Sequence, residues 1–113
     1  MKSNKSILVA MICVFLLAFS SVKAQSDTLK VHTSAECGTC KSTIEKNLNF
    51  EKGVKRATLN VDDKIVTIIY NPEKTTPAQL RKAISDIGYD ADSIPANPKA
   101  YQNLKSCCKK DGH

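Results

Sequence analysis

Two cysteines three residues apart, Cys37 and Cys40, form the sequence Cys-Gly-Thr-Cys. The residues before them alternate apolar and polar side chains, as in a strand, and those after them have helical spacing. The first cysteine therefore lies in a loop and the second in an opening helical turn, so both sulfurs can face one point. Such a pair predicts a soft-metal site or a redox-active dithiol, with a small local disulfide as the alternative that has no function.

The start of a helix favours the reactive form of these thiols. Its free backbone amides, with Lys41 close in sequence, are expected to stabilise a thiolate. Thiolates select monovalent copper, mercury, cadmium or zinc and disfavour calcium and magnesium. Two thiolates alone suit an ion with near-linear coordination, whereas zinc prefers four ligands and would need Glu36, His32 or the C-terminal tail to complete its set.

A second cysteine pair, Cys107 and Cys108, lies with His113 in a polar tail that spans residues 96–113. Lysines flank the pair, so we do not expect it in a core. Its candidate roles are accessory metal binding, a vicinal disulfide or no role beyond sensitivity to oxidation. We expect short helix at most in the tail, or disorder, and we hypothesise that the tail folds back over the first cysteine pair.

Residues 1–24 have the composition of a secretory signal peptide, with Lys2 and Lys5 before an apolar run at 7–19 and a small residue, Ala24, at the expected cleavage site. The apolar run is shorter than the roughly 20 residues that span a bilayer. We therefore expect export, with the periplasm as the location. Disulfide frameworks are common in exported proteins, but two tight local pairs would close loops too short to stabilise the fold much.

The chain after the signal peptide is expected to form one small domain over residues 25–95, followed by the tail. Without the first 24 residues the net charge falls from +6 to +3, because three lysines leave and all 11 acidic residues stay. This balance, with no basic stripe, disfavours nucleic-acid binding. We find no set of residues typical of a catalytic site, so we predict a protein that is not an enzyme, and we expect a monomer.

The secondary-structure pattern predicts an α+β fold. A helix is indicated where Thr76 is a candidate N-cap, Pro77 is the first helical residue and Gln79 a capping-box partner, and Gly88 ends it. The other expected elements are a strand at 28–33, a helix at 41–49, strands at 54–61 and 64–70 around a turn at 62–63, and a strand at 89–94. The order βαββαβ predicts a ferredoxin-like sandwich, a four-stranded antiparallel sheet with two helices on one face.

With these landmarks in order, residues 28–94 resemble the heavy-metal-associated domain family, which includes copper chaperones, the N-terminal domains of metal-exporting ATPases and a periplasmic mercury-binding protein. The residues that carry the resemblance are Cys37-Gly38-Thr39-Cys40, Ile44, Leu48, Gly53-Val54, the run from Val66 to Tyr70 with Asn71-Pro72, Ala83-Ile84 and Gly88-Tyr89. The resemblance implies that Cys37 and Cys40 bind one soft metal ion, copper first and then mercury or zinc and cadmium. It also implies transfer by thiolate exchange to a metal-transporting membrane protein or another periplasmic carrier.

Four positions bear on this resemblance. Family members usually carry Gly-Met where this chain has Ser34 and Ala35, so the loop is expected to be looser or its gap filled by another side chain. Glu36 adds a carboxylate that either favours a divalent ion or lies in solvent. Tyr89 matches a tyrosine that bacterial members carry near the metal loop, where its ring either has an electronic effect on the site or simply packs over the sheet edge.

Two rival functions use the same cysteines. A thiol-disulfide oxidoreductase would use Cys37 as nucleophile, but the chain has no tryptophan, no aromatic residue just before that cysteine and no proline between the pair. A structural zinc protein would gather all four cysteines of the mature chain around one ion and would unfold with a chelator. A carrier would stay folded without metal, because its apolar pattern already supplies a core.

Overall fold

The computed structural model describes residues 25–109, so the predicted signal peptide and His113 lie outside the described part of the chain. Its elements are β1 (Asp27–His32), α2 (Gly38–Asn49), β2 (Val54–Asn60), β3 (Ile65–Tyr70), α3 (Pro77–Asp86), α4 (Pro98–Gln102) and the short 3-10 helix η1 (Ser106–Cys108). The two predicted helices of the domain and its first three predicted strands are confirmed. The tail contains the short helix expected there, α4.

The sheet has the order β1-β3-β2 and both of its strand pairs are antiparallel. Its register places Val31 of β1 and Leu59 of β2 on either side of Val66 in the central strand, and all three are buried. Their neighbours along each strand are more exposed. This alternation gives the sheet one buried face, as the period of two in the sequence predicts.

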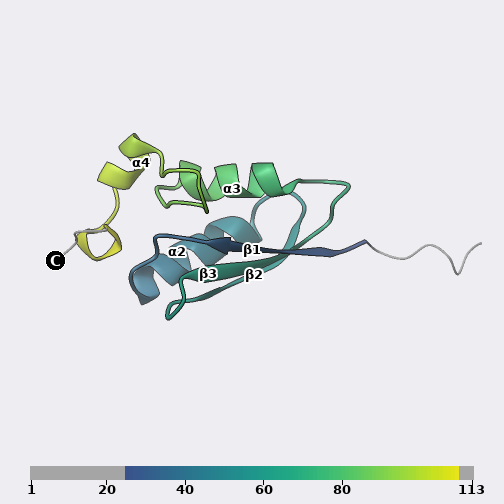
Figure 1. Cartoon of the computed structure of the whole chain (residues 1–113), viewed down its shortest axis with the longest axis horizontal. Coiled ribbons are helices and arrows are strands. Elements are labelled where there is room, and N and C mark those ends of the chain that lie inside the picture. The colour runs from purple at the N-terminus through teal and green to yellow at the C-terminus, as the bar shows by residue number, and fades with distance from the viewer. Residues whose placement is uncertain (1–24, 110–113) are drawn as a thin grey trace, which may run out of the picture.

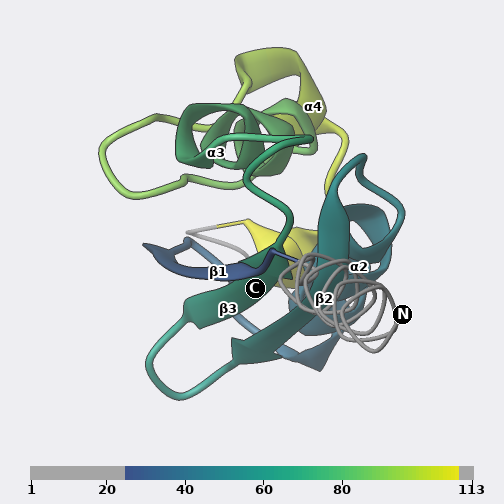
Figure 2. The same cartoon turned by 90° about the vertical axis from the view of Figure 1, so that its right-hand side faces the viewer.

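Helices α2 and α3 both contribute to the core over that face. Ile44 and Leu48, one helical turn apart, are buried on α2, and Leu80 and Ile84 are buried on α3. The predicted cap is confirmed, because the Thr76 hydroxyl accepts a hydrogen bond from the backbone N–H of residue 79 at 3.2 Å. Figures 1 and 2 show α3 lying over the sheet, and α2 beginning at the end of the molecule where the tail also lies.

The prediction of a fourth strand at 89–94 is wrong, since the sheet of the described residues has three strands. Ala91 makes only isolated bridges, one just beyond β1 and one to Ile94. Asp92 has a left-handed backbone conformation (φ 52°) that reverses the chain, and its carboxylate accepts the hydrogen bond of the His32 N–H at 2.9 Å. The Asp92 N–H donates to the His32 carbonyl at 2.8 Å, but a side chain takes the place of the strand carbonyl that would accept the return bond, and the pairing ends there.

The tail is attached to the C-terminal end of α3. The Ser85 hydroxyl donates to the Pro95 carbonyl at 2.7 Å, and the Ser85 carbonyl accepts from the Asn97 N–H at 3.0 Å. Gly88 has φ +105°, and a Cβ there would lie 3.0 Å from the backbone of Ala100 in α4. A glycine is therefore needed both to end α3 and to admit α4, which directs the chain back toward the start of α2.

Helices long and apolar enough to cross a membrane are absent from residues 25–109.

Candidate metal centre

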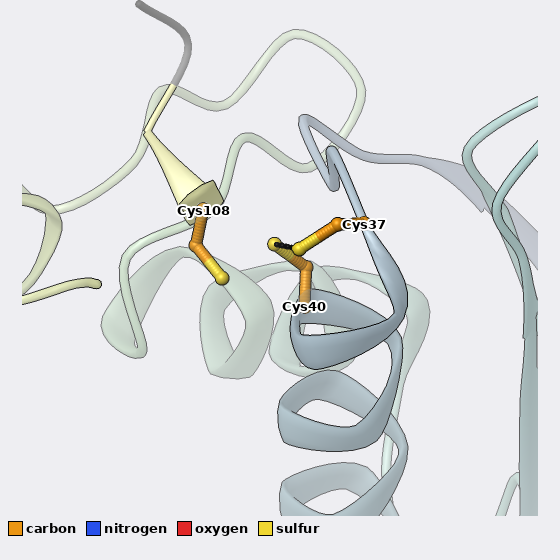
Figure 3. A group of neighbouring side chains, drawn as sticks. All are labelled: Cys37, Cys40 and Cys108. Carbon is orange, nitrogen blue, oxygen red and sulfur yellow. Dashed lines mark hydrogen bonds between the residues drawn. The ribbon is translucent and has the colours of Figure 1, made fainter. Parts of the chain in front are cut away.

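The sulfurs of Cys37 and Cys40 lie 3.7 Å apart at the N-terminus of α2 (Figure 3). Cys37 is the N-cap residue with an extended backbone, and Cys40 lies in the first turn of the helix. Cys40 is fully buried, whereas Cys37 is only partly buried. The predicted convergence of the two thiols on one point is thus present, with one sulfur open to an incoming ion or partner.

The backbone at this helix start favours a thiolate. Hydrogen bonding from the backbone N–H of Cys40 lowers the pKa of the Cys37 thiol from its ordinary value of 9.0 to about 6, against the opposing effect of burial. The Cys107 thiol and the backbone N–H of Thr39 lower it further. Cys37 is therefore a thiolate at neutral pH, the form that binds metal and attacks disulfides.

The Lys41 ammonium binds other groups, and it is not among the main causes of the lowered pKa of Cys37. Its ammonium lies 2.6 Å from a carboxylate oxygen of Glu45 and 2.7 Å from the carbonyl of Leu59 in β2. The Glu45 carboxylate also accepts the Leu59 N–H at 2.8 Å. Lys41 thus joins α2 to β2, and the helix amides are the main donors to Cys37.

Cys108 is the third sulfur at this site. It is 3% exposed and belongs to the hydrophobic core, so the expectation that the tail cysteines stay outside the core is wrong for this residue. The sulfurs of Cys37, Cys40 and Cys108 all lie within 4.8 Å of one another, and Figure 3 shows Cys108 facing the other two from the tail. The hypothesised return of the tail over the loop is therefore present in the structure.

The two tail cysteines differ in their surroundings. Burial, with a smaller effect of Cys40, raises the pKa of the Cys108 thiol to about 12. Cys107 is exposed, and its sulfur lies 3.9 Å from that of Cys108 without a disulfide. Cys107 is not part of the three-sulfur cluster.

The other side chains considered as zinc ligands lie outside the cluster. Glu36 forms an ion pair with Lys64 at 3.2 Å, with about a third of each side chain exposed. His32 is exposed, and its backbone N–H binds Asp92. Among the named residues that lie within 25–109, only Cys108 supplies a further ligand atom next to the pair.

Hydrogen bonds fix the loop before Cys37, where the sequence left open a looser loop or a filled gap. The Thr33 hydroxyl donates to the Lys64 carbonyl at 2.9 Å and accepts from the Ala35 N–H at 3.2 Å. The Ser34 hydroxyl accepts from the Asp90 N–H at 2.9 Å. Ala35 itself is completely buried, so the loop is anchored to the turn after β2 and to the segment after α3.

Tyr89 is completely buried beside the cluster. Burial raises the pKa of its hydroxyl, and the neighbouring sulfurs of Cys108 and Cys40 raise it further. Within residues 25–109 this hydroxyl makes no hydrogen bond of sound geometry. A buried hydroxyl without a partner is costly, so Tyr89 is a donor available to a charged sulfur.

Residues 28–90 match the family model described as "Heavy-metal-associated domain". The match covers more than half of the chain and includes the cysteine pair. The chain belongs to the heavy-metal-associated domain family. The domain found in the structure, with its cysteine pair at a strand-to-helix junction, is the metal-binding module of that family.

Named relatives and solved structures agree with this membership. The "Copper-transporting ATPase 1" of Mus musculus is 40% identical over 78 residues, which is 69% of this chain but 5% of the mouse protein. The structure titled "CopZ metallochaperone" is 33% identical with a TM-score of 0.55, over 57% of this chain and 98% of that one. Oxidized MerP from Ralstonia metallidurans CH34 is 22% identical with a TM-score of 0.58, over 60% of this chain and 96% of MerP, and supports the fold alone.

Proposed function

We propose that this protein is an exported carrier or scavenger of one soft metal ion, which Cys37 and Cys40 bind. The observation that supports this most is the pair of sulfurs 3.7 Å apart at a helix N-terminus in a heavy-metal-associated domain. One sulfur is partly exposed and is held as a thiolate by the helix amides. Most of the hydrophobic core is formed by the sheet and helices themselves, so we expect the protein to stay folded without the ion.

Delivery would occur by ligand exchange. A thiolate of the partner forms a bond to the ion, the bond from Cys37 or Cys40 then breaks, and the released sulfur takes up a proton. The oxidation state of the ion does not change. Because Cys37 is the more exposed of the two, we propose that the partner's thiolate enters on its side of the site.

Monovalent copper is the first candidate ion, followed by mercury and then zinc or cadmium. Thiolate ligands and a low coordination number suit copper(I), and two of the similar proteins are titled as a copper transporter and a metallochaperone. Tetrahedral zinc would require a fourth ligand, and the carboxylate of Glu36 is already paired with Lys64. Mercury(II) is also soft enough for a thiolate site.

We further propose a periplasmic monomer that exchanges its ion with a metal-transporting membrane protein or another periplasmic carrier, and that catalyses no reaction. Support for export comes from the composition of residues 1–24. Support for a transporter as partner comes from the similarity to a domain of a copper-transporting ATPase, of which this chain spans only 5%.

Competitive titration tests the choice of ion. The reduced chain beginning at Gln25 is titrated with copper(I), zinc and mercury(II) against chelators of known affinity. We expect one soft ion per chain, tight copper(I) binding and weak zinc binding. Zinc binding tighter than expected for two thiolates, with loss of fold after chelation, would instead support a structural zinc protein.

A separate assay tests thiol-disulfide exchange, because a disulfide-exchange enzyme also needs a cysteine thiolate at neutral pH, as at Cys37. The assay is reduction of insulin disulfides by the purified protein with a thiol reductant. We expect no rate above that of the reductant alone. Robust catalysis would contradict metal carriage as the only function.

A further inference from the structure

The three-sulfur cluster has the dimensions of a three-coordinate site. Metal–sulfur bonds to thiolates are about 2.3 Å long, so a linear two-thiolate ion separates its sulfurs by about 4.6 Å and a trigonal ion by about 4.0 Å. The Cys37 and Cys40 sulfurs are 3.7 Å apart, and Cys108 completes a triangle with no side longer than 4.8 Å. These distances are closer to the trigonal arrangement, and shifts of less than 1 Å would complete it.

The position of Cys108 is set by contacts remote from the sulfurs and by the neighbouring Cys107 carbonyl, which lies 3.7 Å from the Cys37 sulfur. The chain after α3 is held by the hydrogen bonds between Ser85 and the 95–97 segment and by the close packing of α4 against Gly88. The N–H of Cys108 also donates to the Lys105 carbonyl at 2.8 Å within η1. These contacts hold the Cys108 sulfur over the pair.

The buried hydroxyl of Tyr89 is a second, independent indication of a ligand at this site. Tyr89 is completely buried, its hydroxyl has no hydrogen bond of sound geometry within the described residues, and it lies beside the sulfurs of Cys40 and Cys108. A thiolate is a stronger acceptor than a thiol. If the neighbouring thiols bind an ion as thiolates, their sulfurs would accept a hydrogen bond from this hydroxyl.

We propose that Cys108 is the third ligand of the bound ion, and that the C-terminal tail closes the site over it. This rests on the proposed binding by Cys37 and Cys40. The three sulfurs come from the N-cap of α2, its first turn and η1, and the ion lies between a helix terminus and the tail. The exposed Cys107 next to it is not a ligand.

A third ligand from a separate segment also defines how the ion leaves. A partner thiolate forms a bond to the ion while the Cys108–metal bond breaks, and the Cys108 sulfur takes up a proton. The ion keeps three sulfurs and its oxidation state throughout. The tail can then move aside and expose Cys37 and Cys40 to the second exchange.

X-ray absorption spectroscopy of the copper(I)-loaded protein measures this directly, as the number of sulfur neighbours. The wild-type chain from Gln25 to His113 is expected to show three, and Cys108→Ser to show two. Copper(I) affinity, measured by competition, should fall at least about tenfold in Cys108→Ser, equivalent to about 1.4 kcal/mol. The matched control is Cys107→Ser, which should keep three sulfurs and lose much less affinity than Cys108→Ser, since Cys107 only helps to lower the pKa of Cys37.

Failure of this proposal is distinguishable from failure of the proposed function. Two sulfurs in the wild-type protein would overturn the third ligand, and this measurement needs no variant to fold. An unchanged affinity in Cys108→Ser, with the circular dichroism of the wild type, would also overturn it. Binding that survives in Cys37→Ser/Cys40→Ser would instead overturn the two-cysteine site on which the proposal rests.

Discussion

Alkylation of the reduced, metal-free protein with iodoacetamide should modify Cys37 before the other cysteines, and its preference should increase as the pH is lowered. The structural reason is the backbone N–H of Cys40, which with smaller contributions lowers the pKa of Cys37 from 9.0 to about 6. The sign follows from the thiolate being the reactive form. The Cys37 rate should stay nearly constant above pH 7 and fall below about pH 6.

The size of the effect follows from two opposing factors. At pH 7 a thiol of pKa about 6 is roughly 90% thiolate and one of pKa 9.0 about 1%, while nucleophilicity falls about 20-fold over three pKa units for a Brønsted coefficient near 0.45. Cys37 should therefore react about fourfold faster than an ordinary thiol at pH 7. At pH 5 the thiolate fractions differ about 900-fold, so the advantage rises to about 40-fold.

Mass spectrometry of tryptic peptides follows each site. Trypsin separates the peptide with Cys37 and Cys40 from the one with Cys107 and Cys108, and fragmentation assigns the alkylated residue. A small free thiol alkylated in the same buffers gives the reference rate, and Cys37→Ser identifies its contribution. An alkylation rate of Cys37 with its pH midpoint near 9 would show that its pKa is not lowered. A ratio of the Cys37 rate to the rate of the reference thiol that does not change between pH 7 and pH 5 would show the same.

Substitutions at three other positions test separate contacts. Lys41→Met should leave the alkylation midpoint of Cys37 unchanged, because this lysine binds Glu45; the measurement is the pH profile above. Tyr89→Phe should leave the metal-free protein equally stable or up to about 1 kcal/mol more stable in urea unfolding, since it removes a buried hydroxyl without a partner. The same variant should lower copper(I) affinity about tenfold. Asp92→Ala should lower the free energy of unfolding by about 2 kcal/mol, because alanine tolerates the left-handed backbone conformation less well and makes neither hydrogen bond of the carboxylate. Asp92→Asn should lower the free energy of unfolding by less.

Each substitution has an outcome that would contradict its reasoning. A midpoint raised toward 9 in Lys41→Met would show that the lysine, and not the helix amides, holds the Cys37 thiolate. A strongly destabilised Tyr89→Phe would mean that its hydroxyl already has a partner in the metal-free protein. Equal losses in Asp92→Ala and Asp92→Asn would assign the effect to the ion pair with Arg81 rather than to the turn.

The local patterns of this sequence predicted most of the domain. Alternation and helical spacing predicted the right elements for the three strands and for α2 and α3, and Thr76 with Pro77 marked the start of α3. The position of Cys37 and Cys40 at the start of a helix was predicted correctly, because their spacing spans a single helical turn. Such features depend on neighbours in the chain, so they can be inferred without knowledge of the fold.

The errors concern contacts between distant segments. The strand at 89–94 is prevented by the conformation of Asp92 and its bond to His32, 60 residues earlier. Cys108 has polar neighbours in sequence but is buried, because the attachment of the tail to α3 returns it to the start of α2. Neither contact leaves a periodic pattern of apolar residues in the sequence, although the adjacent Cys107 and Cys108 did indicate that the tail is unusual.

The most direct test of the central claim is the copper(I) stoichiometry of the reduced protein, measured by native mass spectrometry for the wild type and for Cys37→Ser/Cys40→Ser. The wild type should bind one ion per chain under competition from a weak chelator, and the double variant should bind none under the same conditions while keeping its circular dichroism spectrum. One ion per chain retained by the double variant would contradict the claim that these two cysteines carry the metal.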